Sequence, residues 1–184
     1  MRQEIRIAGF GGQGVVLTGY LLGKALALYS DREAVMTQSH GPEARGGASS
    51  ADLVVSTEPI AYPFVQQPDF LVALSQEAYS KFRPSIKPGA LIVIDQDLVQ
   101  PLKNEQFHAI PATQLAEDLG RRIVTNVVML GFFTALTEIV TPQAMMKALQ
   151  DTLQPRILDL NIEAFNTGLE YQETPSLQPF EEEI

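Results

Sequence analysis

An apolar run that begins at Ile5 leads into the sequence Gly-Phe-Gly-Gly-Gln-Gly at residues 9–14. Glycine lets the backbone turn sharply, and a bound group can approach the main chain because no Cβ stands in the way. An almost wholly apolar segment, residues 15–29, follows at once, so the pattern predicts a strand, a tight turn and a helix. The first amides of a helix lack intrahelical acceptors and lie at the positive end of its dipole, which favours a phosphate or carboxylate. We therefore predict a cofactor-binding or anion-binding loop made of Gly11, Gly12, Gln13 and Gly14.

The spacing Gly9-x-Gly11-x-x-Gly14 also fits the dinucleotide-binding fingerprint. That fingerprint is permissive, and it also occurs as a turn that only packs a helix on a strand. NAD-binding domains usually place an acidic residue at the end of the second strand, where it holds a ribose hydroxyl. The second predicted strand, residues 34–38, continues into Ser39 and has no carboxylate at its end. This counts against an ordinary NAD or FAD domain, and a P-loop is excluded because no Gly-Lys-Ser/Thr follows the glycines.

A second candidate loop covers residues 39–50, where Gly-Pro, Gly-Gly and serine residues favour turns. Arg45 precedes Gly46 and Gly47, so a guanidinium that can bind phosphate or carboxylate in bidentate fashion stands beside open backbone amides. We predict Arg45, Gly46 and Gly47 as further binding residues. The alternative is a solvated pair of Glu43 and Arg45 in an ordinary turn.

Groups that could catalyse a reaction are scarce. The chain has no cysteine, so disulfides, thiolate zinc sites, iron–sulfur ligation and thiol catalysis are not expected. His40 and His108 lie far apart without a metal-binding spacing, and no Gly-x-Ser-x-Gly elbow is present. Glu43 has no evident partner for work as a general base. The sequence therefore predicts a binding domain without catalytic or metal-ligating residues of its own.

The composition also limits the class of protein. With 184 residues, 45% of them apolar and 19% charged, the chain is expected to form one globular domain. A net charge of -9 and the lack of a Lys/Arg cluster argue against nucleic-acid binding. The longest apolar stretch, residues 15–29, is too short to span a membrane, and the chain begins without a signal-peptide pattern. We therefore expect a cytoplasmic protein.

Strands and helices are predicted to alternate along the chain. Continuous apolar runs at residues 69–75 and 89–95 are typical of a parallel sheet that is buried on both faces. Together with the other predicted elements they favour an α/β fold, a Rossmann-like doubly wound, mostly parallel sheet with helices on both faces. The remaining strands are expected at 5–10, 34–38, 51–56 and 106–110, and the helices at 13–29, 76–82, 114–119, 126–140, 141–151 and 156–171.

The folded domain is predicted to cover residues 1–171. The helix at 13–29 is apolar on nearly all sides, so we expect it to be covered by the sheet and by another helix or a partner subunit. Its groove of Gly19, Gly23 and Ala27 favours close packing on the sheet over a dimer contact. Residues 172–184 contain four glutamates, two prolines and no basic residue, and we predict an acidic C-terminal arm, either solvated or laid on a partner.

Three segments carry a family resemblance beyond composition: residues 9–15, residues 41–47 (Gly-Pro-Glu-Ala-Arg-Gly-Gly) and residues 126–131 (Asn-Val-Val-Met-Leu-Gly). In this order and spacing they resemble the gamma subunit of the 2-oxoacid:ferredoxin (acceptor) oxidoreductases, most closely the 2-oxoglutarate type. The resemblance extends over about residues 4–171. The alternatives are the gamma subunit of the pyruvate, branched-chain or indolepyruvate enzyme, and a free-standing dinucleotide-binding protein.

The resemblance implies a place in a heteromeric complex that oxidatively decarboxylates a 2-oxoacid to an acyl-CoA and reduces ferredoxin. Thiamine diphosphate, Mg²⁺ and the iron–sulfur clusters would lie on the partner alpha, beta and delta subunits. This chain would hold no cofactor tightly and would be inactive alone. It would contribute to binding the cosubstrate coenzyme A and to subunit packing, and its exposed apolar helix surfaces would favour a homodimer when it is isolated.

Overall fold

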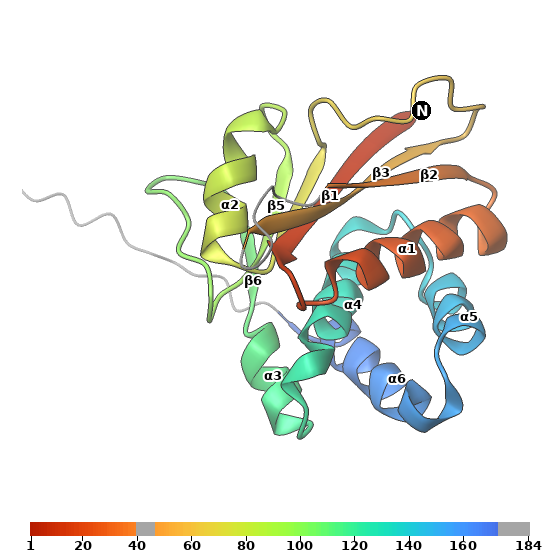
Figure 1. Cartoon of the computed structure of the whole chain (residues 1–184), viewed down its shortest axis with the longest axis vertical. Helices are drawn as coiled ribbons and strands as arrows, with labels where there is room; N and C mark the ends of the chain where they lie inside the picture. Colours follow the sequence, from red (N-terminus) through yellow and green to blue (C-terminus); the bar gives the residue numbers. More distant parts are fainter. Residues whose placement is uncertain (40–46, 173–184) are drawn as a thin grey trace, which may run out of the picture.

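Six strands form one sheet in the part of the chain that the computed structural model describes, residues 1–39 and 47–172 (Figure 1). Their order across the sheet is β2-β3-β1-β4-β5-β6. The apolar runs that predicted strands near residues 5–10, 69–75 and 89–95 form β1, β4 and β5, three adjacent strands of the sheet. The strands are β1 (Arg2–Phe10), β2 (Glu33–Ser39), β3 (Ala48–Ser56), β4 (Phe70–Ala73), β5 (Leu91–Asp95) and β6 (His108–Ile110).

The prediction of a mostly parallel sheet is confirmed for β1, β4, β5 and β6, which pair in parallel. In contrast, β3 pairs antiparallel with both β1 and β2. Parallel neighbours need a crossover of a dozen or more residues, and only residues 40–47 separate β2 from β3. These two strands therefore return as a hairpin, and the carboxyl end of β1 lies beside the beginning of β3, with Phe10 opposite Ala48.

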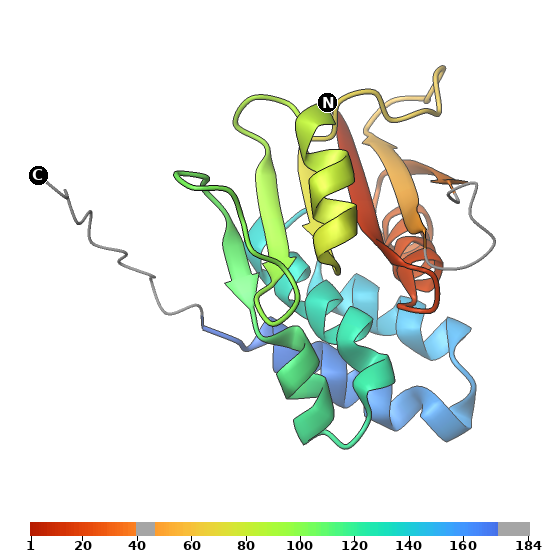
Figure 2. The same cartoon turned by 60° about the vertical axis from the view of Figure 1, so that its left-hand side comes forward.

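Helices cover both faces of the sheet, as the sequence predicted. Figure 2 shows α2 in front of one face and α1 behind the other, and α4 shares the larger apolar core with α1. On the second face α5 and α6 add a further layer that completes the larger apolar core. The helices are α1 (Val15–Tyr29), α2 (Gln76–Phe82), α3 (Ala112–Asp118), α4 (Thr125–Thr137), α5 (Pro142–Thr152) and α6 (Pro155–Leu169), with short 3-10 turns at Arg83–Ser85 and Arg122–Val124.

Gly19 and Gly23 of the predicted groove lie against β3, which confirms close packing on the sheet at these two positions, whereas Ala27 is exposed. A Cβ at Gly19 would come within 2.6 Å of the Ala51 Cβ. The other side of α1 packs on α5. Tyr20 nevertheless remains 50% exposed and Leu28 64% exposed, so cover of this side by a partner subunit stays a prediction. These two side chains leave an apolar stripe of α1 facing solvent in the single chain.

The closest helix contact joins α4 to α6. All residues from Asn126 to Thr134 are buried, so this part of α4 is covered on all sides. A Cβ at Gly131 would lie only 2.0 Å from the Phe165 carbonyl oxygen, and one at Gly168 only 1.8 Å from that of Val128. The two backbones therefore touch through a pair of glycines, one on each helix.

Two helix starts illustrate how local signals worked. Thr141 caps α5, since its hydroxyl accepts a hydrogen bond from the Ala144 N–H at 3.2 Å, and Pro142 takes the first helical position. The start of α3 was predicted two residues too late, because a distant carboxylate, Asp95, accepts a hydrogen bond from the Thr113 N–H.

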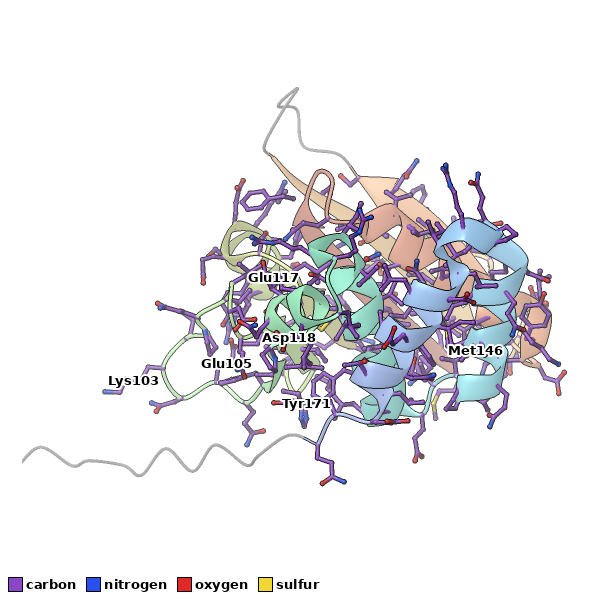
Figure 3. All side chains as sticks on the ribbon, turned by 90° about the horizontal axis from the view of Figure 1, so that it is seen from below. Lys103, Glu105, Glu117, Asp118, Met146 and Tyr171 are labelled. Atoms are coloured by element: carbon purple, nitrogen blue, oxygen red, sulfur yellow. The ribbon has the colours of Figure 1, made fainter. Side chains whose placement is uncertain are left out.

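The described part of the chain ends close to residue 171. The Tyr171 ring packs edge-to-face on Phe132, with ring centroids 5.6 Å apart (Figure 3). The predicted acidic arm lies outside the described residues except for Gln172, so it stays a prediction. Within the described ranges, no helix is both long enough and apolar enough to cross a membrane.

Candidate functional site

The predicted glycine loop joins the carboxyl end of β1 to α1 (Figure 1). The next parallel strand, β4, also ends at this edge, but its connection runs through α2 on the opposite face of the sheet. In open α/β sheets a crevice forms where neighbouring connections diverge to opposite faces, and ligands bind in that crevice. The loop thus lies at the topological switch point of this sheet.

Gly11 and Gly12 present an open stretch of backbone at this point. Both residues are exposed, and a Cβ built on either one meets no atom of the described residues within 4 Å. Gly12 has a φ of 94°, in the left-handed region that favours glycine. Among the described residues, no acceptor takes up the N–H of Gly11 or Gly12. Two main-chain donors beside the positive end of α1 are therefore available to a ligand.

Gln13 lies in the same loop, but its side chain turns toward the sheet. The Phe10 N–H donates to Gln13 Oε1 at 2.6 Å, and Gln13 Nε2 donates to the Leu74 carbonyl oxygen at 2.8 Å. The carboxamide therefore ties the end of β1 to the residue that follows β4. The sequence predicted Gln13 as a loop residue but did not predict this pair of hydrogen bonds.

Gly14 connects the first and third sequence segments. Its φ is 74°, and its carbonyl accepts hydrogen bonds from Thr18 Oγ1 at 3.0 Å and from Asn126 Nδ2 at 3.3 Å. A Cβ at Gly14 would lie 2.4 Å from that same Asn126 nitrogen. Asn126 is 3% exposed and also donates to Thr18 Oγ1, so α4 supports the beginning of α1 from below. Asn126 therefore holds the beginning of α1 in place. From the sequence it was known only as the first residue of the third segment that carries the family resemblance.

The second candidate loop is only partly described. Gly47 precedes Ala48, which pairs with Phe10, so Gly47 lies at the same edge of the sheet as the glycine loop. Arg45 and Gly46, together with Glu43 and His40, lie outside the described residues. The binding roles of Arg45, Gly46 and Gly47 stay predictions.

Asp95 is a buried carboxyl group at the carboxyl end of β5 that sequence analysis did not single out. It is 0% exposed, and it accepts hydrogen bonds from Thr113 Oγ1 at 2.6 Å and from the N–H groups of Thr113 and Asp97 at 3.1 Å. Burial raises its pKa above the ordinary value, and the hydrogen bonds from Thr113 and Asp97 oppose this rise. A carboxylate at the end of a long apolar run was the signal available in the sequence.

We expect Asp95 to make the stability of the domain depend on pH. Its pKa in the folded chain lies above the ordinary value of 3.8, so folding favours the protonated form. The free energy of unfolding should therefore fall as pH rises from about 4 through the folded pKa, relative to Asp95→Asn. Urea unfolding of both proteins between about pH 4 and pH 7 measures this difference. If the free energy of unfolding of the wild-type chain rises with pH relative to that of Asp95→Asn, the expectation is wrong. Asp31→Asn removes a carboxylate at an exposed position and serves as the control.

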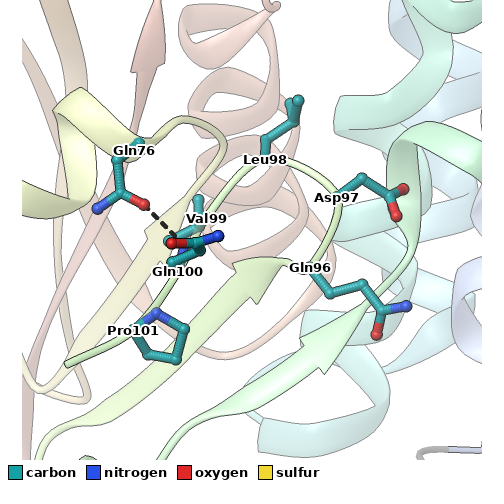
Figure 4. A pocket seen from close by; sticks show the side chains of 7 residues that line it. All are labelled: Gln76, Gln96, Asp97, Leu98, Val99, Gln100 and Pro101. Carbon is teal, nitrogen blue, oxygen red and sulfur yellow. Dashed lines mark hydrogen bonds between the residues drawn. The ribbon is translucent and has the colours of Figure 1, made fainter. Parts of the chain in front are cut away.

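A shallow hollow of about 460 Å³ lies at the same carboxyl edge, between the start of α2 and the segment after β5 (Figure 4). Its lining is mainly polar, with Gln76, Gln96, Asp97 and Gln100. Gln76 Oε1 accepts a hydrogen bond from the Gln100 N–H at 2.7 Å, so this carboxamide is engaged in holding the loop. Within the ranges 1–39 and 47–172, no three His, Asp or Glu side chains come together in a way that could hold a metal ion.

Comparison with known proteins places this geometry in a family. The family model described as pyruvate ferredoxin/flavodoxin oxidoreductase matches residues 4–171. The 2-oxoglutarate synthase subunit KorC of Methanocaldococcus jannaschii is 49% identical over 175 residues, which cover 92% of this chain and 94% of that protein.

Two solved structures share the fold. The gamma subunit of a keto/oxoacid ferredoxin oxidoreductase from Geobacter sulfurreducens superimposes with a TM-score of 0.83 at 38% identity, covering 92% of this chain and 95% of that one. The 2-oxoglutarate:ferredoxin oxidoreductase from Magnetococcus marinus, solved with 2-oxoglutarate, coenzyme A and succinyl-CoA bound, superimposes with a TM-score of 0.81 at 26% identity, covering 91% of this chain and 30% of that one. The chain therefore belongs to the pyruvate ferredoxin/flavodoxin oxidoreductase family, as a gamma subunit of a 2-oxoacid:ferredoxin oxidoreductase that is most similar to the 2-oxoglutarate type.

Proposed function

We propose that this chain is the gamma subunit of a cytoplasmic 2-oxoglutarate:ferredoxin oxidoreductase and that its glycine loop helps to bind coenzyme A. In the reaction, 2-oxoglutarate loses CO₂, its succinyl group passes to the sulfur of coenzyme A, and the released electrons reduce ferredoxin. The alpha, beta and delta subunits supply thiamine diphosphate, Mg²⁺ and iron–sulfur clusters. The gamma chain alone has no activity and binds no cofactor tightly.

The choice of 2-oxoglutarate rests on similarity along nearly the whole chain. The KorC relative is named as a subunit of 2-oxoglutarate synthase, and 49% identity over 92% of this chain supports a shared substrate. The need for partner chains is supported by the Magnetococcus protein, in which the matching module is 30% of a longer chain. In that protein the matching module is joined to further parts of the same chain.

The role in coenzyme A binding depends on the open amides of Gly11 and Gly12. Coenzyme A carries a pyrophosphate and a further phosphate, and main-chain N–H groups at a helix N-terminus favour such groups. The residues that the structure describes fit this ligand, because none of them comes within 4 Å of a Cβ built on Gly11 or Gly12. The structural relative from Magnetococcus marinus was solved with coenzyme A bound, which supports coenzyme A as the ligand of the complex. Arg45, Gly46 and Gly47 are proposed as further contacts from the neighbouring loop.

Gly11→Leu tests this role in the assembled complex. The new side chain would occupy the space in front of the amides, and Gly11 has no positive φ that would strain another residue. The KM for coenzyme A should rise at least about tenfold, equivalent to about 1.4 kcal/mol, while the KM for 2-oxoglutarate stays unchanged. Steady-state kinetics of the reconstituted complex with each substrate varied in turn provides the measurement.

Ala27→Leu is the matched control, since it adds the same side chain at an exposed position near the other end of α1. It should leave both KM values unchanged. An unaltered KM for coenzyme A in Gly11→Leu would remove the glycine loop from the binding site. Arg45→Ala, measured in the same assay, tests whether the second loop contributes.

A further inference from the structure

The side chain of Gln13 bridges the two strands that flank the switch point. Its Oε1 accepts from the Phe10 N–H at 2.6 Å, and its Nε2 donates to the Leu74 carbonyl oxygen at 2.8 Å. Its own backbone N–H donates to the Phe10 carbonyl oxygen at 3.2 Å. Both ends of the carboxamide are thus engaged with the main chain of the protein, directly beneath the open turn.

Gly9 provides the room for this arrangement. A Cβ at Gly9 would lie 3.1 Å from the Leu74 Cβ and only 2.6 Å from Gln13 Oε1. The second distance is too short for a contact between a carbon and an oxygen atom, so the Gln13 carboxamide would have to move. The glycine at position 9 and the glutamine at position 13 are therefore parts of one packing unit. This unit fixes both ends of the segment that contains Gly11 and Gly12.

We propose that Gln13 is a positioning residue, which holds the N–H groups of Gly11 and Gly12 toward the phosphates of coenzyme A and does not itself touch the ligand. This inference rests on the proposed function of the glycine loop. Without the bridge from Phe10 to Leu74, the turn can adopt other conformations. Ordering the turn when the ligand binds then makes the binding free energy less favourable. The two hydrogen bonds of Gln13 hold the turn in one conformation before the ligand binds, so this loss of affinity is avoided.

The first test compares coenzyme A with pantetheine, which has the same thiol arm but no phosphate. In the reconstituted complex, Gln13→Met keeps the length of the side chain and loses both hydrogen bonds without adding a charge. We expect its KM for coenzyme A to rise about tenfold and its KM for pantetheine to stay unchanged. A KM that rises equally for both acceptors, or for neither, would overturn the inference.

A second variant reaches the same contact without changing residue 13. Gly9→Ala places a Cβ against Gln13 Oε1 and displaces the carboxamide from the Phe10 N–H. It should show the same selective rise for coenzyme A, and it keeps the inference testable if Gln13→Met assembles poorly. A Gly9→Ala complex with wild-type KM values would contradict the role given to the bridge.

Gly11→Leu separates failure of this inference from failure of the proposed function. If Gly11→Leu raises the KM for coenzyme A while Gln13→Met and Gly9→Ala do not, the loop binds coenzyme A and the bridge has only a structural role. If none of the three variants changes that KM, the proposed function itself fails. A purely structural role also predicts a lower free energy of unfolding in Gln13→Met with no selectivity between the two thiols.

Discussion

Gly168→Ala is expected to prevent the chain from folding stably. The added Cβ would lie 1.8 Å from the carbonyl oxygen of Val128 and 2.9 Å from the Phe132 nitrogen, both in the backbone of α4. Neither atom can move away unless α4 separates from α6, and that contact holds part of the larger core. The cost should exceed about 4 kcal/mol, a large share of the roughly 5–15 kcal/mol that stabilises a typical domain.

The reciprocal glycine gives an independent version of this test. Gly131→Ala would place its Cβ 2.0 Å from the carbonyl oxygen of Phe165, so we expect a loss of similar size. Gly11→Ala is the control, because its Cβ meets no atom within 4 Å. Urea unfolding and the yield of soluble protein measure the effect, and a wild-type midpoint for Gly168→Ala would refute the close helix contact.

Arg6→Met should produce the second large loss of stability. Arg6 donates to the two oxygens of Asp52 at 2.8 Å from Nε and at 2.6 Å from the terminal nitrogen. The side chains of Arg6 and Asp52 are only 12% and 11% exposed, and the guanidinium also packs over the Phe82 ring. Removing the cation leaves a buried carboxylate on β3 without its partner, which costs about 3–5 kcal/mol.

The double variant Arg6→Met with Asp52→Leu distinguishes this cause from simple loss of packing. Replacing both members of a buried ion pair with apolar residues is often close to neutral, so the double variant should recover most of the lost stability. Unfolding free energies of the four proteins form a double-mutant cycle. If the stability losses of the two single variants add up in the double variant, the broken ion pair is not the cause of the loss in Arg6→Met.

Local signals predicted most of the elements. The apolar runs that became β4 and β5 have the length and continuity of buried parallel strands, and they are identifiable without any partner. The helix Gln76–Phe82 begins and ends where it was predicted, since Ser75 caps it and Pro84 follows it. These features depend on residues that are near one another in the chain.

Contacts between distant residues could not be predicted in the same way. The hydrogen bonds from Thr113 to Asp95 move the start of α3, and they join residues that are 18 positions apart. The contact of Gly168 with α4 depends on how two helices cross, which composition does not determine. The antiparallel β3 likewise depends on strand order rather than on its own apolar pattern.

In the candidate site too, local features could be predicted and contacts between distant residues could not. The position of Gly11 and Gly12 at the end of β1 followed from glycine spacing between a strand and a helix. The inward direction of the Gln13 side chain did not, because its partner Leu74 belongs to a strand end 61 residues away. Gly47 lies at the same edge of the sheet as the glycine loop, a placement that follows from the pairing of β3 with β1.

Equilibrium binding of coenzyme A to the assembled complex is the most direct test of the central claim. Complexes that contain the wild-type chain or Gly11→Leu should be titrated with labelled coenzyme A in the absence of 2-oxoacid. We predict a Kd at least about tenfold higher for Gly11→Leu, with no change in the Kd for pantetheine. Equal affinities of the two complexes for coenzyme A would contradict a role for the glycine loop in binding its phosphates.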